Sequence, residues 1–407
     1  MLKCGLLGEK LGHSYSPRIH AELGDYEYKL YEKSPAELPA FLQQGEFHGL
    51  NVTIPYKKTV IPYCAELSEE AASIGSVNTL LRRADGSLYG DNTDAFGFRK
   101  MLEKSGIRVK GKKALIFGSG GASVTVRAVL TALGAGEIVT ISRSGADNYT
   151  NLARHADAQI FVNATPLGMY PDNGAAPVCL RDFPRCEGAL DVVYNPSRTA
   201  FLLEAEAMGI PHAGGLTMLV QQAIRASELF TGKKVDPAEA ERIEGLIRRE
   251  MENIILIGMP GCGKTSAGRL LAERLHRPFA DCDSFIERHS GMTIAEIFAA
   301  EGESGFRRRE TEALRELCKQ SGTVIATGGG CVTVEENYPL LHQNGTIVYI
   351  MRDLSALPTE GRPLSQSTAV EELYAKRKHA YARFADISVE NRGSLEELCN
   401  AIWEILP

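Results

Sequence analysis

Short apolar runs alternate with longer amphipathic stretches along most of the 407-residue chain. The short runs have the length of strands and the longer stretches that of helices, which predicts an α/β protein with largely parallel sheets. Two apolar runs, Ala114 to Phe117 and Ile254 to Ile257, pass directly into a glycine-rich loop and then into a helix-like stretch. At about 100–200 residues per domain, the length suggests two or three domains.

A polar stretch, Asp236 to Glu250, separates the two glycine-rich regions. Pro237 suits the first turn of a helix, acidic residues come early and arginines come late, as the helix dipole favours. We therefore predict a helix that runs almost to the second strand, with a short connection between the two halves. Met251 follows at once, so the second half reads like the start of a protein and suggests a fusion.

Composition and charge exclude several classes of protein. With 44% hydrophobic and 24% charged residues, the chain is typical of globular proteins. No apolar run approaches the roughly 18 residues of a membrane span, and residues 1–8 lack a signal-peptide pattern. The net charge of −6, without a long basic run, gives no nucleic-acid footprint. The nine cysteines are scattered, which favours reduced thiols. We expect a cytoplasmic protein that binds neither membrane nor nucleic acid; the oligomeric state stays open.

The second glycine-rich loop, Gly258 to Thr265, reads GMPGCGKT and fits the P-loop pattern G-x-x-x-x-G-K-[ST] between a strand and a helix. Its backbone N–H groups would face phosphates, Lys264 would reach the β and γ oxygens, and Thr265 would offer a hydroxyl to Mg²⁺. The predicted ATP-binding residues are Gly258, Gly261, Cys262, Gly263, Lys264, Thr265 and Ser266.

An acidic pair follows the P-loop. In FADCD, Phe279 to Asp283, the carboxylates of Asp281 and Asp283 stand two residues apart, and on an extended segment both would point to one side. One carboxylate could serve the metal ion and the other could take the proton of an attacking hydroxyl.

Four more motifs complete this half: EGESGFRRRE (301–310), TGGG (327–330), GRPL (361–364) and RKHAY (377–381). With the P-loop and the acidic pair, their order and spacing resemble shikimate kinase along residues 251–407. The resemblance implies that ATP phosphorylates shikimate with the help of Mg²⁺. It places the substrate on Asp283, Arg307, Gly329, Gly330 and Arg377, magnesium on Thr265 and Asp281, and the lid arginine Arg362 over the phosphates.

Neighbouring residues refine this prediction. Glu310 stands one helical turn after Arg307 and would orient it, whereas Arg308, Arg309 and Arg315 would form a solvated helix face. The segment between Arg352 and Arg362 is shorter than is usual in the family and lacks an arginine ahead of RPL, which puts ATP affinity in question.

The first glycine-rich loop, GSGGAS (118–123), is a weak signal alone, because tight strand–helix turns share it. After the next strand, about 20 residues past the loop, comes Ser-Arg-Ser. An acid there would bind the ribose of NAD, whereas an arginine accommodates the 2′-phosphate of NADP. The predicted NADP-binding residues are Gly118, Gly120, Gly121, Ala122, Ser142, Arg143 and Ser144.

Four polar motifs lie in apolar surroundings within residues 1–98: GEKLGHSYSP (8–17), GLNVTIPYK (49–57), IGSVNTL (74–80) and GDNTDAFGF (90–98). Such segments are poor core material unless their polar groups are used. They are followed by GSGGA, VNATPLGM (162–169), DVVYNP (191–196) and GLTMLVQQA (215–223). Together these motifs resemble shikimate dehydrogenase over residues 1–250.

This resemblance implies roles for eight residues. Lys57 would donate a proton to the substrate oxygen as hydride arrives, and Asp94 would hold the lysine charged and oriented. Ser14 and Ser16 would bind the substrate carboxylate. Ring hydroxyls would meet Thr53, Asn78 and Gln222, and Tyr194 would border the nicotinamide. Lys58 is interpreted as a solvated neighbour, and His13 and His20 as structural.

The implied architecture has three parts. Residues 1–98, with helices from about 214 to 250, form an α/β substrate domain; residues 99–213 form a Rossmann-like NADP domain; and residues 251–407 form a P-loop domain of the nucleoside monophosphate kinase type. The 17 residues from Gly145 to Phe161 are too few for the usual helix, strand and helix. We therefore expect the cofactor domain to lack part of a βα unit and to have a smaller sheet.

The leading interpretation is a bifunctional enzyme of aromatic amino acid biosynthesis. It would reduce 3-dehydroshikimate to shikimate with NADPH and then phosphorylate the 3-hydroxyl of shikimate with ATP. Two alternatives stay open. A quinate-type dehydrogenase would be favoured by an acid near Ser142, which is absent, and a non-catalytic sensor or scaffold predicts loss of Lys57, Asp94, Lys264 or Asp283, all of which are present.

Overall fold

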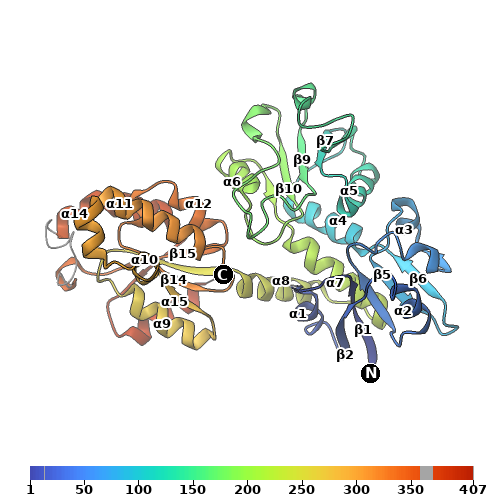
Figure 1. The fold of residues 1–407 in the computed structure, drawn as a ribbon, viewed down its shortest axis with the longest axis horizontal. Coiled ribbons are helices and arrows are strands. Elements are labelled where there is room, and N and C mark those ends of the chain that lie inside the picture. Colours follow the sequence, from blue (N-terminus) through green and yellow to red (C-terminus); the bar gives the residue numbers. More distant parts are fainter. Residues whose placement is uncertain (13, 358–369, 407) are drawn as a thin grey trace. The chain divides into compact units, whose positions relative to one another are not determined.

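The computed structural model describes residues 1–12, 14–357 and 370–406. They divide into two compact units, Met1–Ile247 and Arg248–Pro407 (Figure 1). Both units are built from sheets with helices packed against them, so the predicted α/β class is confirmed. His13 and Arg362, with the rest of the GRPL motif, lie outside the described residues.

The first sheet of the first unit has six strands in the order β2-β1-β3-β5-β6-β4. β1 pairs in parallel with β2 and β3, whereas β5 is antiparallel to β3 and β6. The strands are β1 (Leu2–Gly8), β2 (Tyr26–Glu32), β3 (Gly49–Val52), β4 (Glu66–Leu67), β5 (Thr79–Arg82) and β6 (Leu88–Asp91). The connecting helices are α1 (Ser16–His20), α2 (Leu38–Gln44), the 3₁₀ helix η1 (Ile61–Tyr63) and α3 (Glu69–Ile74).

The second sheet of this unit has five parallel strands in the order β11-β10-β9-β7-β8. They are β7 (Lys113–Phe117), β8 (Glu137–Ile141), β9 (Ile160–Asn163), β10 (Gly188–Asp191) and β11 (His212–Ala213). The helices are α4 (Thr93–Ser105), α5 (Gly121–Ala132), η2 (Leu152–His155), η3 (Leu180–Asp182), α6 (Ala200–Ala207) and α7 (Leu216–Thr231). Residues 142–159, all of them described, contain no α-helix or strand, only η2. The predicted loss of part of a βα unit is confirmed.

Strand β7 is buried on both faces, as a central parallel strand must be. On one face Ala114 and Ile116 pack in a cluster with Val126 and Val129 of α5. On the other face Leu115 and Phe117 belong to a second cluster, which contains Phe161 of β9 and Phe201 of α6. Because this strand is held from both sides, the loop at its carboxyl end starts from a fixed position.

The second unit has one sheet of five parallel strands in the order β13-β14-β12-β15-β16. The strands are β12 (Asn253–Ile257), β13 (Phe279–Asp281), β14 (Val324–Ala326), β15 (Gly345–Met351) and β16 (Ile387–Glu390). The helices are α9 (Lys264–Leu275), α10 (Cys282–Ser290), α11 (Ile294–Leu317), η4 (Cys331–Thr333), α12 (Asn337–His342), η5 (Leu354–Ala356), α14 (Val370–Phe384) and α15 (Leu395–Ile405). The P-loop thus follows the central strand.

Helix α8 (Pro237–Met251) confirms the helix predicted at the junction. One residue separates it from β12, so the connection is as short as expected. The boundary between the two units falls inside this helix, between Ile247 and Arg248.

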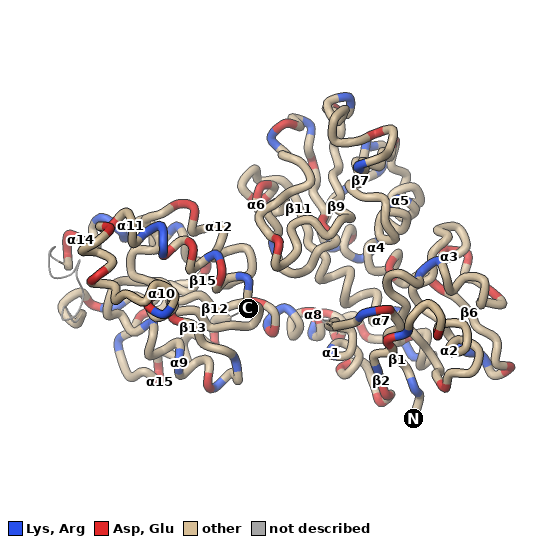
Figure 2. The backbone as a smooth tube through the Cα atoms, in the orientation of Figure 1, with Lys and Arg blue, Asp and Glu red and all other residues tan. Residues whose placement is uncertain are grey.

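Acidic and basic residues are intermixed along both units (Figure 2). Mixed charge of this kind is typical of ordinary globular surfaces. Across the part of the chain that the structure describes, every helix is too short or too polar to cross a bilayer.

Candidate active sites

A cleft of about 460 Å³ opens in the first unit. Its lining comes from β1 and β3 of the first sheet, from the loop after β10 of the second sheet, and from α1, α4, α5 and α7. The cleft brings together all eight residues that the sequence predicts for substrate and catalysis: Ser14, Ser16, Thr53, Lys57, Asn78, Asp94, Tyr194 and Gln222. Residues from separate motifs therefore share one cavity.

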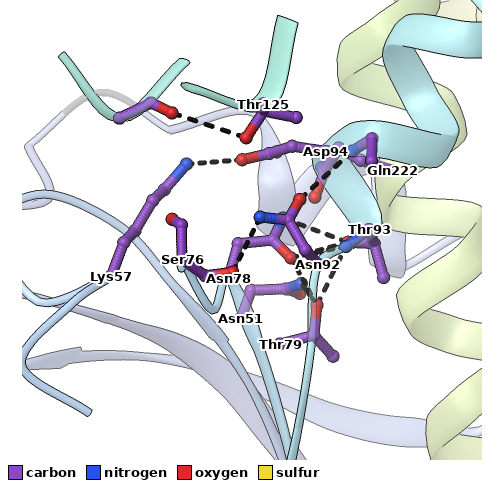
Figure 3. A network of polar contacts seen from close by, with 12 residues as sticks. Asn51, Lys57, Ser76, Asn78, Thr79, Asn92, Thr93, Asp94, Thr125 and Gln222 are labelled. Carbon is purple, nitrogen blue, oxygen red and sulfur yellow. Dashed lines mark hydrogen bonds and ion pairs between the residues drawn. The ribbon is translucent and has the colours of Figure 1, made fainter. Parts of the chain in front are cut away.

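Lys57 and Asp94 form an ion pair in this cleft (Figure 3). Nζ of Lys57 lies 2.6 Å from Oδ2 of Asp94, and the two side chains are 20% and 12% exposed. Asp94 belongs to the first turn of α4, which Asn92 caps by accepting a hydrogen bond from the Ala95 N–H (3.2 Å). A short charge-assisted hydrogen bond with little water around it is a strong one. The pair places a lysine proton against the cavity.

A network of amides and hydroxyls fixes the segment that carries Asp94 (Figure 3). Oδ1 of Asn78 accepts from the Thr93 N–H (2.7 Å), and its Nδ2 donates to the Thr93 hydroxyl (3.1 Å). Asn92 donates to the Ser76 carbonyl (2.9 Å). These bonds tie the start of β5 to the start of α4, so Asn78 both lines the cleft and positions the helix.

The cleft also contains residues that sequence reasoning did not select. Asn51 lines the cleft, and its Oδ1 accepts from the Tyr28 hydroxyl (2.8 Å). Lys10 also lines the cleft. Asn51 could have been found, because it is a polar residue inside the apolar strand of GLNVTIPYK, whereas Lys10 stands out by no pattern.

His20 is structural, as predicted. Its ring stacks on Tyr28, with centroids 3.9 Å apart, and Nδ1 lies 2.6 Å from the Tyr26 hydroxyl. Burial lowers the pKa of His20 to about 3, so the imidazole stays neutral at working pH. Lys58 is exposed, as predicted for a solvated neighbour of Lys57.

The loop between β7 and α5 offers an open, positively polarised helix end. Gly120 is the N-cap of α5 and makes no side-chain cap, and a Cβ added to it would meet no atom within 4 Å. A Cβ on Gly121 would meet Lys57 Cδ at 3.7 Å, so the loop borders the Lys57–Asp94 pair. Free backbone N–H groups at a helix start bind phosphate. The space and polarity fit the pyrophosphate of a dinucleotide.

The other residues predicted to bind the cofactor lie in the same unit. Gly118 has φ +105°, a conformation that favours glycine, and a Cβ there would come within 3.0 Å of the Ala164 carbonyl. Ser142, Arg143 and Ser144 follow β8 at the carboxyl edge of the same sheet, and the Arg143 side chain is exposed. Ala122 lines the cleft itself.

Asp191 organises the loop that carries Tyr194. The buried carboxylate accepts hydrogen bonds from the Val193 N–H (2.9 Å), Asn163 Nδ2 (3.0 Å) and the Thr199 hydroxyl (2.7 Å). Burial raises the pKa of Asp191 to about 7, and the three donors oppose this rise. The Tyr194 ring meets Tyr15 edge-on, with centroids 6.2 Å apart. Sequence reasoning missed Asp191, although it begins the motif DVVYNP.

The P-loop of the second unit has the expected geometry. Gly258, Gly261 and Gly263 have φ values of +144°, +83° and +107°, which glycine tolerates best. The buried ammonium of Lys264 donates to the carbonyls of Gly258 (2.9 Å) and Met259 (3.1 Å). The lysine therefore lies across the loop, where phosphate oxygens would replace these carbonyls. The remaining predicted loop residues, Cys262 and Ser266, flank it.

The expectation that Asp281 and Asp283 share an extended segment is wrong. β13 ends at Asp281 and α10 begins at Cys282, because Asp281 caps this helix by accepting from the Ser284 N–H (3.1 Å). The two carboxylates still have separate surroundings. Oδ2 of Asp281 accepts from the Thr265 hydroxyl (2.8 Å), which suits a shared magnesium shell.

Asp283 lies at an exposed position of α10, with its carboxyl close to Glu310 and to Gly328 of the glycine loop. Although the residue is exposed, the surrounding protein limits hydration of its carboxyl. This desolvation, together with the negative charges of Glu310 and Asp281, raises the pKa of Asp283 to about 6, against the opposing charges of Lys264 and Arg307. Arg307 Nη1 lies 2.6 Å from Oε2 of the fully buried Glu310, which confirms that Glu310 orients this arginine. Burial raises the pKa of Glu310 as well.

Glycines line the predicted substrate pocket beside Arg307 and Glu310. A Cβ on Gly330 would collide with the Arg307 guanidinium, and one on Gly328 would collide with Oε1 of Glu310. The Gly329 carbonyl accepts from Arg377 Nη1 (3.2 Å). The predicted substrate residues of this half therefore converge, and Gly328 adds to them. Gly328 is part of the motif TGGG, but the sequence does not show that Glu310 packs against it too closely for a side chain.

The other arginines of this half lie away from the pocket. Arg308 is exposed, and Arg309 and Arg315 form surface ion pairs with Glu301 and Glu336, each 2.6 Å long. Arg352, by contrast, donates to the Gly261 carbonyl of the P-loop (3.3 Å).

Comparison with known proteins supports two families in one chain. Residues 6–80 match the family model of the shikimate dehydrogenase substrate binding domain, and residues 215–242 match that of the shikimate 5′-dehydrogenase C-terminal domain. A shikimate dehydrogenase (NADP(+)) of Clostridium perfringens (strain SM101 / Type A) is 37% identical over 260 residues, which cover 59% of this chain and 96% of the relative. The chain belongs to the shikimate dehydrogenase family.

Solved structures agree with this shikimate dehydrogenase assignment. A chorismate mutase/shikimate 5-dehydrogenase fusion protein from Clostridium acetobutylicum is 34% identical with a TM-score of 0.57, over 60% of this chain and 97% of that one. Shikimate 5-dehydrogenase from Thermus thermophilus, in complex with NADP(H) and shikimate, is 34% identical with a TM-score of 0.55, over 60% and 99%. A quinate dehydrogenase from Corynebacterium glutamicum, in complex with NAD, is 28% identical with a TM-score of 0.54, over 60% and 98%.

The second unit matches a different family model. Residues 260–407 match the family model of shikimate kinase. The chain is therefore a fusion of shikimate dehydrogenase with a shikimate kinase domain, a bifunctional enzyme of the shikimate pathway, as the sequence motifs predict.

Proposed function

We propose that this chain reduces 3-dehydroshikimate to shikimate with NADPH and phosphorylates the 3-hydroxyl of shikimate with ATP. The observation that carries the proposal is the Lys57–Asp94 pair, 2.6 Å apart in a cleft that borders an open helix N-terminus. The P-loop domain supplies the second activity. We assign the substrate to residues 1–98 and 214–250, and the cofactor to residues 99–213.

In the dehydrogenase cleft, Lys57 holds the proton that the substrate carbonyl oxygen receives. Bound NADPH supplies hydride to the carbonyl carbon. Asp94 orients the Lys57 ammonium and accepts a hydrogen bond from the substrate hydroxyl next to the carbonyl. The carboxylate of Asp94 therefore holds both the proton donor and the substrate in place. Ser14 and Ser16 bind the carboxylate, and the amides and hydroxyl of Asn78, Gln222 and Thr53 orient the ring, with Tyr194 closing the nicotinamide side.

In the kinase pocket, Asp283 accepts the proton of the attacking hydroxyl. Arg307 and Arg377 bind the substrate carboxylate, which holds the hydroxyl in line with the P-loop. Lys264 neutralises charge on the transferred phosphoryl group, while Thr265 and Asp281 would hold the magnesium that ATP brings. These residues act by positioning and charge, the main sources of catalysis in phosphoryl transfer.

A two-cofactor assay on the full chain tests the proposal. Shikimate with NADP⁺ should raise nicotinamide absorbance, and shikimate with ATP should release ADP. Lys57→Ala should lower the first rate by about 10²–10⁴-fold, the usual contribution of a general acid, and leave the second unchanged. Lys264→Ala should do the reverse. Lys58→Ala, one residue from Lys57 and exposed, is the matched control and should leave both rates unchanged.

Two results would contradict the proposal. If neither half of the wild-type chain turns over shikimate, the protein is a sensor or scaffold. Quinate with NAD⁺ is the second arm of the assay, prompted by the likeness to the quinate dehydrogenase. A higher kcat/KM for quinate with NAD⁺ than for shikimate with NADP⁺ would show that quinate, and not shikimate, is the substrate of the dehydrogenase half.

A further inference from the structure

The crossover between β8 and β9 is short and runs over a defined face of the sheet. Leu152 of this crossover packs against the cluster that contains Leu115 and Phe117, whereas α5 packs on the opposite face of β7. The crossover therefore covers, at the carboxyl end of β7, the face that α5 leaves open.

Hydrogen bonds hold the first part of the crossover in place. The Ser142 N–H donates to the Asp147 carbonyl (3.2 Å), and Asp147 Oδ1 lies 3.0 Å from His155 Nε2. Asn148 Nδ2 donates to the Gly145 carbonyl (3.1 Å), and Asn151 Nδ2 to the Ala146 carbonyl (2.8 Å). Residues 145–151 thus form a turn that presents one aromatic side chain, Tyr149.

Tyr149 covers Phe117 and remains 40% exposed. The two rings are nearly parallel, at 23°, with centroids 6.2 Å apart. Phe117 is fully buried and immediately precedes Gly118 of the phosphate loop. Partial burial raises the pKa of the Tyr149 hydroxyl, and the nearby positive charge of Arg143 lowers it. An exposed aromatic ring and an exposed arginine therefore both belong to the segment that follows β8.

The direction in which a dinucleotide must lie in the site decides which of its ends reaches Tyr149. The nicotinamide end must meet Lys57 and Asp94, which border Gly121 on the cleft side. Phosphates at the start of α5 leave the adenosine to extend the other way, towards the edge strand β8. Arg143 follows this strand, and a ring beside it has the flat apolar face that adenine requires.

We propose that Tyr149 forms the adenine wall of the NADP site, with its exposed ring face stacked on the base and Arg143 beside it on the 2′-phosphate. The proposal rests on the NADP-dependent function above and adds a residue from the shortened crossover. The same segment that lost a βα unit then supplies a contact to the cofactor.

Binding of adenosine 2′,5′-bisphosphate to the full-length protein tests this contact without catalysis. Isothermal titration should give the wild type and Tyr149→Phe equal affinity within about twofold, because Phe keeps the ring. Tyr149→Leu keeps an apolar cover on Phe117 but lacks the aromatic face, so its affinity should fall about tenfold, within the range of base–aromatic stacking. Shikimate titration of each variant checks that the cleft is intact.

The oxidised cofactors separate stacking from charge. Tyr149→Leu should weaken NADP⁺ and NAD⁺ by the same factor, whereas Arg143→Gln should weaken NADP⁺ alone. Equal affinity of wild type and Tyr149→Leu for adenosine 2′,5′-bisphosphate would overturn the adenine wall and leave the dehydrogenase assignment standing. Failure of the wild type to bind this ligand would overturn the NADP assignment and the wall together.

Discussion

At the scale of single residues, the carboxyl of Asp283 combines restricted hydration with two negative neighbours, although the residue itself is exposed. Its carboxyl lies close to Glu310 and Gly328, and its pKa is raised to about 6. A proton acceptor is most useful when its pKa lies near the working pH. Asp283 is therefore suited to orient and deprotonate a hydroxyl near neutral pH, whereas Asp281 interacts with the P-loop threonine.

The pKa of Asp283 gives a pH prediction for the kinase reaction. Because the ionised carboxylate is the active form, log kcat/KM for shikimate should fall with unit slope below a pH of about 6. Glu310→Gln removes a negative charge that raises this pKa, so the acid limb should move to lower pH. ATP titrates equally in both proteins, so the difference between the two profiles isolates Asp283. Identical acid limbs would contradict the assignment.

Residue types in motifs could be predicted, but contacts between distant segments could not. Lys57 and Asp94 were predicted as a pair, and their 2.6 Å contact is present. Asp191 and Gly328 were missed because their roles depend on neighbours elsewhere along the chain, Asn163 and Glu310. A single sequence does not show which distant residues contact each other in the folded protein.

At the scale of elements, Asp191 connects four pieces of the cofactor half. It ends β10, accepts from Asn163 at the end of β9, and accepts from Thr199, the N-cap of α6. Its third donor is the Val193 N–H, in the loop leading to Tyr194. One buried carboxylate therefore sets the relative position of two strands, a helix and a loop that lines the cleft.

Removing this carboxylate should destabilise the first unit. Asp191→Ala leaves three buried donors without an acceptor, so the free energy of unfolding should fall by about 2–4 kcal/mol. Asp191→Asn keeps one acceptor and can donate to Thr199, so it should lose about 1 kcal/mol. Urea unfolding followed by circular dichroism measures both. A change below about 0.5 kcal/mol in the alanine variant would show that the junction is held elsewhere.

Element types followed from the sequence more readily than element boundaries. The strand–loop–helix order around both glycine loops was correct, and so was the shortened crossover, because periodicity and residue count decide them. The helix start at Cys282 was missed, since the capping acceptor Asp281 also reads as a metal ligand in an extended segment. An aspartate in that position supports both interpretations.

At the scale of the whole molecule, the two units have separate cores. The large apolar cluster of the second unit includes Ile254 and Phe384, and clusters of the first unit include Phe117 and Phe230. The single tryptophan of the chain, Trp403, lies in α15 of the second unit and is 53% exposed. Its fluorescence therefore reports on the kinase half.

Ligands should stabilise the two halves independently. A ligand at about 100 times its Kd raises the stability of the state that binds it by about 2.7 kcal/mol. Mg·ADP should therefore shift the Trp403 unfolding transition in urea to higher concentration, while adenosine 2′,5′-bisphosphate should leave it in place. A shift of the Trp403 transition by the second ligand would show that the halves unfold as one cooperative body.

The boundary inside α8 has a consequence for how the two activities can be parted. The Met251 carbonyl, on the last turn of this helix, accepts hydrogen bonds from the Gly322 N–H (2.9 Å) and Asn344 Nδ2 (3.2 Å). Arg277 donates to the carbonyl of Arg249, two residues before the apparent start of the kinase. The last residues of α8 therefore form hydrogen bonds within the kinase half, although the helix begins in the dehydrogenase half. A gene split at this methionine would keep the Met251 carbonyl but remove that of Arg249, so the downstream product would lose the acceptor that Arg277 uses.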